Sequence, residues 1–262
     1  MADMKTVILC GGFGTRIRDV SADVPKPMIT IGQLPILWHL MRYYAHFGND
    51  EFVLCLGYKG EVIKDFFLNY QARTRDFTID LGKDEAITYH SRETEVGWKV
   101  TLVDTGLNAM TGARVKRVQH HVEGSPFMLT YGDGLSNIDI RALKAFHQKQ
   151  GRTATVTGVR PPGRFGELVI DKSGLASEFN EKPQATGGRI SGGYFVLESK
   201  IFDYLDDREG LVFEQEPMRA LVSDGQLAVY EHDDFWQCMD THRDWTLLDS
   251  MATSERPPWK LW

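Results

Sequence analysis

Near its start the chain passes from four apolar residues, 7–10, directly into a turn that contains Gly11, Gly12 and Gly14. The apolar run predicts a buried strand, and the glycines predict a turn that a large ligand can approach closely. Because glycine has no Cβ, several backbone N–H groups of such a turn can point into one concavity and bind phosphate oxygens. The segment therefore predicts a strand followed by a polyphosphate site, with a nucleoside triphosphate as the leading ligand.

Two cations follow the turn: Arg16 comes directly after Thr15, and Lys26 stands between two prolines that fix the backbone around it. The turn matches neither of the commoner phosphate motifs. A Walker A loop requires Lys-Ser or Lys-Thr where this chain has Thr15 and Arg16. The dinucleotide fingerprint requires a third glycine where the chain has Ile17. The turn therefore indicates another class of nucleotide-binding protein.

The first half of the chain alternates short apolar runs with amphipathic patterns, which predicts βαβ units and a parallel sheet. Asp139 stands at an N-cap position, and Gly151 follows the end of the same helical pattern. Residues 77–90 alternate apolar and polar side chains, which predicts an extra hairpin. Strands are expected over residues 6–10, 51–56, 101–103, 127–131 and 153–159, and helices over 35–47, 61–70 and 139–150.

After Pro161 shorter strands are expected over residues 167–170, 175–180 and 193–197, and helices over 201–205, 214–224 and 241–251. The predicted fold class is α/β: a Rossmann-like, mixed but mostly parallel central sheet flanked by helices, with a small mixed α+β extension that binds a second substrate. We interpret residues 1–262 as one domain, with a nucleotide-binding core over about 1–160 and an acceptor-binding and closing part over 161–262.

Small or polar residues follow four of the expected strands: Gly11, Gly57, Thr105 with Gly106, and Asp133. In open α/β sheets ligands bind beyond the carboxyl ends of the strands. The four strand ends are therefore expected to meet at one edge of the sheet, where an enzyme would place its active site.

The composition limits the classes of partner that the chain is expected to bind. The formal net charge of −6 disfavours general nucleic-acid binding, because the chain has no basic stripe to neutralise phosphates. Its 3 cysteines lack metal-ligand spacing and read as thiols in a reducing cytoplasm. The N-terminus does not read as a signal peptide, and no run approaches the roughly twenty apolar residues of a membrane span. A cytoplasmic enzyme without a membrane partner is expected.

The glycine turn resembles the signature of the sugar-phosphate nucleotidyltransferases, and further blocks with the spacing of that family follow along nearly the whole chain. Their order is most similar to the branch of the family that uses CTP and glucose 1-phosphate. The blocks are residues 11–16, 25–28, 99–106, 110–114, 131–134, 162–166, 181–183, 214–217 and 236–241.

The resemblance implies one nucleotidyltransferase domain in which a sugar 1-phosphate oxygen attacks the α-phosphorus of CTP. Arg16 and Lys26 would be the catalytic cations that hold the triphosphate and the leaving diphosphate. Of the three basic residues 114, 116 and 117, one is expected on a solvated helix face. The implied nucleotide-binding residues are Leu9, Gly11, Gly12, Gly14, Thr15, Arg16, Lys26, Thr105, Gly106 and Arg114.

Asp133 and Asp240 are the implied ligands of Mg²⁺, which usually takes only one or two protein carboxylates and keeps several waters. Each has a plainer interpretation: Asp133 stands in a Gly-Asp-Gly sequence that suits an Asx turn, and Asp240 precedes a helical pattern that it could cap. The resemblance also implies a homo-oligomer.

The implied acceptor-binding residues are Glu181, Lys182, Ser191 and Gly192, with Lys182 on the acceptor phosphate and Glu181 on sugar hydroxyls. Ser191 departs from the family pattern, which has Asn there. A hydroxyl offers fewer hydrogen bonds than an amide, so the departure weakens the choice of glucose more than the choice of CTP. Three alternatives therefore stay open: another phosphorylated acceptor, UTP or dTTP as the donor, and a nucleotide-sensing module without turnover.

Overall fold

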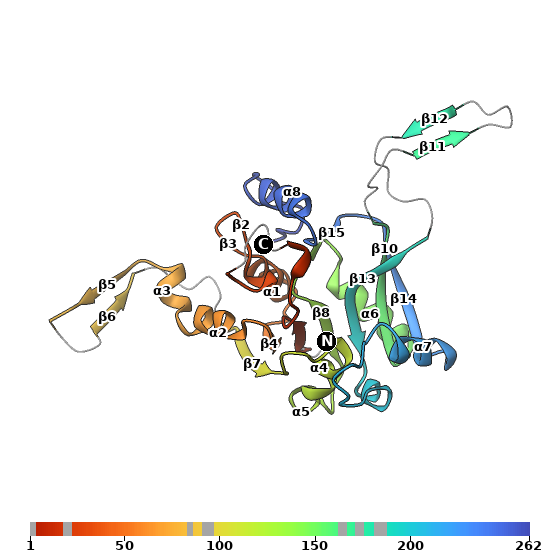
Figure 1. Cartoon of the computed structure of the whole chain (residues 1–262), viewed down its shortest axis with the longest axis horizontal. Helices are drawn as coiled ribbons and strands as arrows, with labels where there is room; N and C mark the ends of the chain where they lie inside the picture. Colours follow the sequence, from red (N-terminus) through yellow and green to blue (C-terminus); the bar gives the residue numbers. More distant parts are fainter. Residues whose placement is uncertain are drawn as a thin grey trace.

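The computed structural model describes residues 4–17, 23–82, 86–90, 97–161, 167–170, 176–180 and 188–262. Among these residues the central sheet has seven strands in the order β14-β10-β13-β8-β1-β4-β7 (Figure 1). All run parallel to one another except β13, which is antiparallel to both β8 and β10. The strands are β1 (Thr6–Leu9), β4 (Glu51–Leu56), β7 (Lys99–Asp104), β8 (Phe127–Tyr131), β10 (Ala154–Val159), β13 (Ile190–Leu197) and β14 (Leu227–His232).

Helices cover both faces of this sheet. The described α-helices are α1 (Ile36–His46), α2 (Gly60–Leu68), α3 (Tyr70–Thr74), α4 (Thr111–Arg117), α5 (Gln119–Val122), α6 (Ile140–Gln150), α7 (Glu216–Ser223) and α8 (His242–Ala252). Short 3-10 turns are η1 (Thr15–Ile17), η2 (Lys26–Met28) and η3 (Ser199–Tyr204). Within the described residues, no helix combines the length and the apolar character needed to cross a membrane.

The strands alternate their side chains between two apolar cores. Ile8 and Leu54 point to the core that α1, α2, α6 and α8 close, whereas Val7 and Val53 point to the core that α4, α5 and α7 close. Successive side chains of a strand face opposite sides, so a continuous apolar run is what a strand covered on both faces requires. The central strands of the sheet are therefore the buried runs that the sequence indicated.

The part of the chain that the structure describes has four smaller two-stranded ribbons outside the central sheet: β2 (Thr30–Ile31) with β3 (Leu34–Pro35), β5 (Phe77–Asp80) with β6 (Ala86–Tyr89), β15 (Trp236–Cys238) with β9 (Gly134–Ser136), and β11 (Glu167–Ile170) with β12 (Ala176–Asn180). The ribbons β5–β6 and β11–β12 extend from opposite sides of the body (Figure 1). The β5–β6 ribbon is the hairpin predicted over residues 77–90.

The predicted fold class is confirmed, and so is the helix over 140–150, whose first turn is capped by the Asp139 carboxylate and whose end is capped by Gly151 with φ 58°. Several elements differ from the expectation. The helix expected over residues 201–205 is a 3-10 segment that ends at residue 204. Among the described strands, β2, β3, β9, β14 and β15 were not expected. The strand β14 lies at the edge of the sheet and mixes polar with apolar side chains, so its sequence carries no clear apolar run.

Candidate active site

The parallel strands β8, β1, β4 and β7 are neighbours in the sheet, so the four predicted strand ends do meet at one edge. A cavity of about 420 Å³ opens there. Nine of the predicted site residues line it, namely Leu9, Gly11, Gly12, Gly14, Thr15, Lys26, Arg114, Asp133 and Asp240. The sheet edge therefore brings together most of the nucleotide side and both of the predicted metal ligands.

The glycine turn supplies backbone donors to this cavity. Among the described residues, the amides of residues 11–15 donate no hydrogen bond to another part of the chain. The N–H groups of an irregular loop that line a cavity are available to a ligand, and clustered amides of this kind bind anions. The side chain of Arg16 lies outside the described part of the structure.

Arg114 lies beneath the turn and is only 4% exposed. Its Nη1 donates to the Leu56 carbonyl and the Thr105 hydroxyl, each at 2.8 Å, and its Nη2 donates to the Gly11 carbonyl at 3.0 Å. The guanidinium thus ties together the ends of β1, β4 and β7. Burial lowers the pKa of Arg114, but a guanidinium keeps its proton, so a fixed positive charge lies under the anion site.

The buried guanidinium explains two of the glycines. A Cβ on Gly11 would lie 2.1 Å from Arg114 Nη1, and a Cβ on Gly57 would lie 2.6 Å from the same atom. Real Cβ atoms do not approach a nitrogen so closely, so any larger residue would displace the guanidinium from its carbonyl partners. Gly12 differs, because no described atom lies within 4 Å of the Cβ that a larger residue would carry there.

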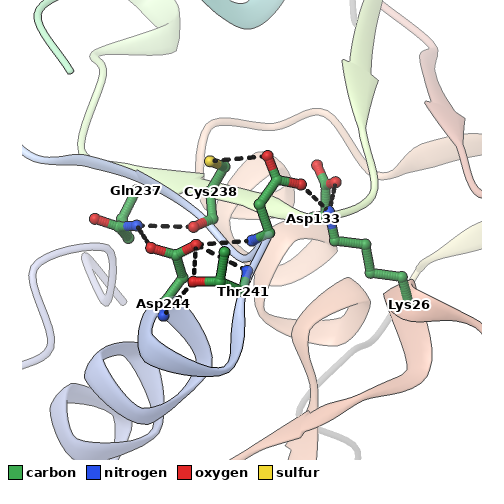
Figure 2. A network of polar contacts seen from close by, with 7 residues as sticks. Lys26, Asp133, Gln237, Cys238, Thr241 and Asp244 are labelled. Atoms are coloured by element: carbon green, nitrogen blue, oxygen red, sulfur yellow. Dashed lines mark hydrogen bonds and ion pairs between the residues drawn. The ribbon is translucent and has the colours of Figure 1, made fainter. Parts of the chain in front are cut away.

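Lys26 contacts both predicted metal ligands in the wall of the cavity. Its Nζ lies 2.6 Å from Asp133 Oδ2 and 2.5 Å from Asp240 Oδ1 (Figure 2). The three residues come from η2, from the turn after β8 and from the turn after β15, more than 100 positions apart in the sequence. Their side chains are 13%, 28% and 29% exposed, so the cluster is shielded but open to a ligand.

Two opposing effects act on the pKa of Lys26. Burial favours the neutral amine and lowers the pKa, but the Coulomb attraction and the hydrogen bonds of Asp133 and Asp240 outweigh burial and raise it above its ordinary value. Lys26 is therefore an ammonium at neutral pH. One positive charge faces two carboxylates, so the cluster keeps an excess of negative charge.

The carboxylate oxygens of Asp133 and Asp240 suit Mg²⁺ as ligands. Two carboxylates that already converge on one cation match an ion that takes one or two protein carboxylates and fills its other positions with water and phosphate oxygens. Within the described residues no group of three or more His, Cys, Asp or Glu side chains could hold a metal. A site completed by the substrate fits this chain better than a metal cage made of protein ligands alone.

Two of the residues predicted to bind the nucleotide, Thr105 and Gly106, do not line the cavity. Thr105 is fully buried, and its hydroxyl donates to the Leu56 carbonyl at 2.6 Å and accepts from Arg114. Gly106 has φ 93°, and its amide donates to Asp104 Oδ1 at 2.9 Å. Both residues shape the turn after β7 that supports Arg114.

Two residues predicted to bind the acceptor, Ser191 and Gly192, lie further along the same edge, because β13 runs antiparallel and begins where β8 ends. Ser191 is exposed, and the carbonyl of the buried Gly192 accepts a hydrogen bond from Trp236 Nε1 at 2.7 Å. A Cβ on Gly193 would lie 2.6 Å from the ring of Tyr131, which lines the cavity. Glu181 and Lys182 lie outside the described residues.

Sequence reasoning missed part of the cavity wall. The segment 107–111 lines it together with Phe13 and Tyr131. The signal was present, because residues 107–111 join the end of β7 to the start of α4 at the edge where the glycine turn lies. Asp244 was also missed, and it accepts the backbone N–H of Asp240 at 3.1 Å.

A family profile and individual relatives of known name both match this chain over nearly its whole length. The sequence profile described as nucleotidyl transferase matches residues 5–251. A glucose-1-phosphate cytidylyltransferase of Salmonella typhimurium is 44% identical over 260 residues, covering 99% of this chain and 100% of that protein. A probable glucose-1-phosphate cytidylyltransferase of Bacillus subtilis is 43% identical over 259 residues, with the same coverage.

Solved structures share the fold. HddC from Yersinia pseudotuberculosis superposes with a TM-score of 0.68 at 25% identity, covering 94% of this chain and 98% of that one. A putative glucose-1-phosphate thymidylyltransferase from Bacillus anthracis superposes with a TM-score of 0.70 at 18% identity, covering 97% and 96%. With its glycine turn, its paired carboxylates and a full-length match, the chain belongs to the nucleotidyl transferase family.

Proposed function

We propose that this protein is a Mg²⁺-dependent cytidylyltransferase that converts CTP and α-D-glucose 1-phosphate into CDP-glucose and diphosphate. The observation that carries the proposal is the convergence of Lys26, Asp133 and Asp240 on the cavity formed by the glycine turn. The names and full-length similarity of the Salmonella and Bacillus relatives support the choice of CTP and glucose 1-phosphate.

The reaction needs no protein nucleophile. An oxygen of the sugar phosphate attacks the α-phosphorus of CTP, and the bond from that phosphorus to the bridging oxygen of the β-phosphate breaks as diphosphate leaves. The barrier arises from bringing two anions together and from charge that builds on the leaving group. A bound divalent cation would neutralise phosphate charge and fix the direction of attack.

The protein's own groups would each take part of this task. The unpartnered amides of residues 11–15 would bind phosphate oxygens, and the Arg114 charge beneath them would favour the anion. Lys26 would move from the carboxylates to the triphosphate and stabilise the leaving diphosphate. Asp133 and Asp240 would then be free to hold Mg²⁺.

A direct assay tests the proposal. The purified protein is incubated with Mg²⁺, glucose 1-phosphate and each nucleoside triphosphate in turn, and diphosphate release and nucleotide-sugar formation are measured. We expect turnover with CTP well above that with UTP or dTTP. Absence of diphosphate release with CTP would reject the proposal, and thermal stabilisation by CTP without product would instead favour a nucleotide-sensing module.

A different phosphorylated acceptor is the second candidate, and Ser191 is the observation that favours it. Ser191 is exposed, and among the described residues its hydroxyl accepts only a long hydrogen bond, 3.4 Å, from the Gly193 amide. A screen of sugar and polyol phosphates with CTP held constant would compare the wild type with Ser191→Asn. If glucose 1-phosphate is the acceptor, the Asn variant should retain it as the best substrate.

We also propose that the protein is a homo-oligomer in the cytoplasm, in line with its free cysteines Cys10, Cys55 and Cys238. The β5–β6 ribbon supports the oligomer. Phe77, Ile79 and Ile87 lie on one face of it and are 42%, 48% and 44% exposed. A two-stranded ribbon is marginally stable alone, so we assign this apolar face to contact with a second copy of the chain.

A further inference from the structure

Asp240 can serve the reaction only if its carboxylate faces Asp133, yet it lies in a turn between β15 and α8 rather than in a regular element. A loop residue has backbone freedom that a strand or helix residue lacks. Something must therefore hold the turn in place, and the hydrogen bonds around it identify the group that does.

That group is the carboxylate of Asp244, in the first turn of α8 (Figure 2). Its Oδ2 accepts the Asp240 amide at 3.1 Å, the Thr241 amide at 2.9 Å and the Thr241 hydroxyl at 2.8 Å. Its Oδ1 accepts Gln237 Nε2 at 3.1 Å, and Gln237 belongs to β15 and is 5% exposed. One carboxylate thus joins the strand before Asp240, the turn that carries it and the helix after it.

Helix capping accounts for only part of this arrangement. The Thr241 hydroxyl accepts the Asp244 amide while the Asp244 side chain accepts the Thr241 amide, which is a complete capping box. The bonds to the Asp240 amide and to Gln237 are additional, and neither satisfies an orphan group within the helix. They fix the residue that carries the metal-facing carboxylate.

We propose that Asp244 is a positioning residue for the divalent cation: it holds the Asp240 backbone so that the Asp240 carboxylate faces Asp133 before the metal arrives. The inference rests on the proposed function, because it assigns Asp240 to the metal. Groups that orient metal ligands typically change metal affinity or activity by about 10- to 100-fold when removed.

The test compares Asp244→Ala with Asp249→Ala. Asp249 lies on the same helix and also accepts a backbone amide, that of Gly32 at 2.8 Å, but among the described residues it forms no hydrogen bond with the turn of Asp240. Two quantities are measured: the Mg²⁺ concentration for half-maximal turnover, and Mn²⁺ binding to the enzyme without nucleotide by electron paramagnetic resonance.

We expect Asp244→Ala to raise both the half-saturating Mg²⁺ concentration and the Mn²⁺ dissociation constant by about tenfold, with a much smaller loss of turnover at saturating Mg²⁺. Asp244→Asn keeps one acceptor oxygen and should recover much of the lost affinity. Asp249→Ala should lower the melting temperature without changing either metal measurement.

A fall in melting temperature with unchanged metal affinity in Asp244→Ala would overturn the inference, since Asp244 would then be a helix cap only. If Asp244→Ala does not fold, the same two metal measurements are made on Asp244→Asn. Each is then expected to rise by about threefold, and unchanged values would overturn the inference. These outcomes apply when the wild type shows Mg²⁺-dependent turnover. A wild type with neither Mg²⁺-dependent turnover nor Mn²⁺ binding would overturn the proposed function, and the inference with it.

Discussion

At the scale of single residues, the site depends on how a few charges are placed under and around the glycine turn. Arg114 is the clearest example, because it fills the space that side chains at residues 11 and 57 would need. The sequence marked Arg114 as a nucleotide-binding candidate beside two other basic residues. Which one is buried depends on how α4 packs on the sheet, and that packing is not encoded in the local pattern.

The two neighbouring glycines of the turn should respond differently to the same change. In Gly11→Ala the new Cβ displaces the Arg114 guanidinium from the carbonyls of residues 11 and 56, and the buried N–H donors that lose these acceptors cost about 1–3 kcal/mol. The Cβ of Gly12→Ala has no atom of the described residues within 4 Å. Urea unfolding should therefore show Gly11→Ala to be less stable by about 2 kcal/mol and Gly12→Ala to be close to the wild type. Equal stabilities would contradict the role assigned to the guanidinium.

Lys26 should compete with the metal in the absence of nucleotide. Its ammonium lies 2.6 and 2.5 Å from the two carboxylates that would hold the ion. In Lys26→Met this internal cation is gone, so Mn²⁺ should bind the nucleotide-free protein at least ~10-fold more tightly. The same variant should lose ~100-fold or more in turnover, because a preorganised charge partner of the leaving group is removed.

Mn²⁺ titrations of Lys26→Met, Asp133→Asn and the wild type provide the comparison. Asp133→Asn removes a ligand and should bind Mn²⁺ more weakly than the wild type. If Lys26→Met binds Mn²⁺ no more tightly than the wild type, the lysine and the metal do not share a site. Near-normal turnover in Lys26→Met would show that its catalytic role is misassigned.

At the scale of elements, the apolar strands buried on both faces were predictable, whereas the edge strand β14 was not. The strands β4 and β8 have the predicted ends because their apolar runs are continuous and end at glycine or polar residues. The start of β13 at Ile190 and its position between β8 and β10 depend on long-range pairing. Lys26, Asp133 and Asp240 were identified through their motifs, but their contact depends on how distant turns meet.

The C-terminal tail is another element whose position follows from packing. Trp259 is fully buried, its Nε1 donates to His39 Nδ1 at 3.4 Å, and its ring contacts Phe235, just before β15. His39 Nε2 contacts the Ile31 carbonyl at 3.1 Å, so a neutral imidazole protonated on Nε2 satisfies both partners. Burial lowers the pKa of His39 to about 4. The hydrogen bond to the Ile31 carbonyl raises this pKa, but by less than burial lowers it.

This histidine predicts a stability change in weak acid. Between pH 6.5 and about 4 the unfolded chain binds a proton at His39 that the folded chain does not, so the free energy of unfolding falls as the pH falls. The difference in pKa corresponds to roughly 3 kcal/mol at most. Urea unfolding at pH 7.5 and pH 4.5 should show that the free energy of unfolding falls less with pH in His39→Gln than in the wild type. Equal losses would mean that His39 titrates normally.

At the scale of the whole molecule, the β5–β6 ribbon sets the expected assembly. The pairs Phe77–Tyr89 and Ile79–Ile87 share one face, and the pair Thr78–Thr88 lies on the other. Tyr89 also lines a second cavity of about 560 Å³, whose wall contains Phe67 of α2, Tyr70 of α3 and Trp98, just before β7. Apolar surface of this kind is costly in water unless another chain covers it.

The ribbon therefore predicts which substitution separates the subunits. Ile79→Glu places a charge in the middle of the apolar face, and burying it against a second copy would cost several kcal/mol. Thr88→Glu places the same charge on the polar face and should leave assembly intact. Light scattering after gel filtration should give a smaller mass for Ile79→Glu than for Thr88→Glu and the wild type. A monomeric wild type would refute the oligomer, whereas an unchanged mass for Ile79→Glu would place the interface on another surface.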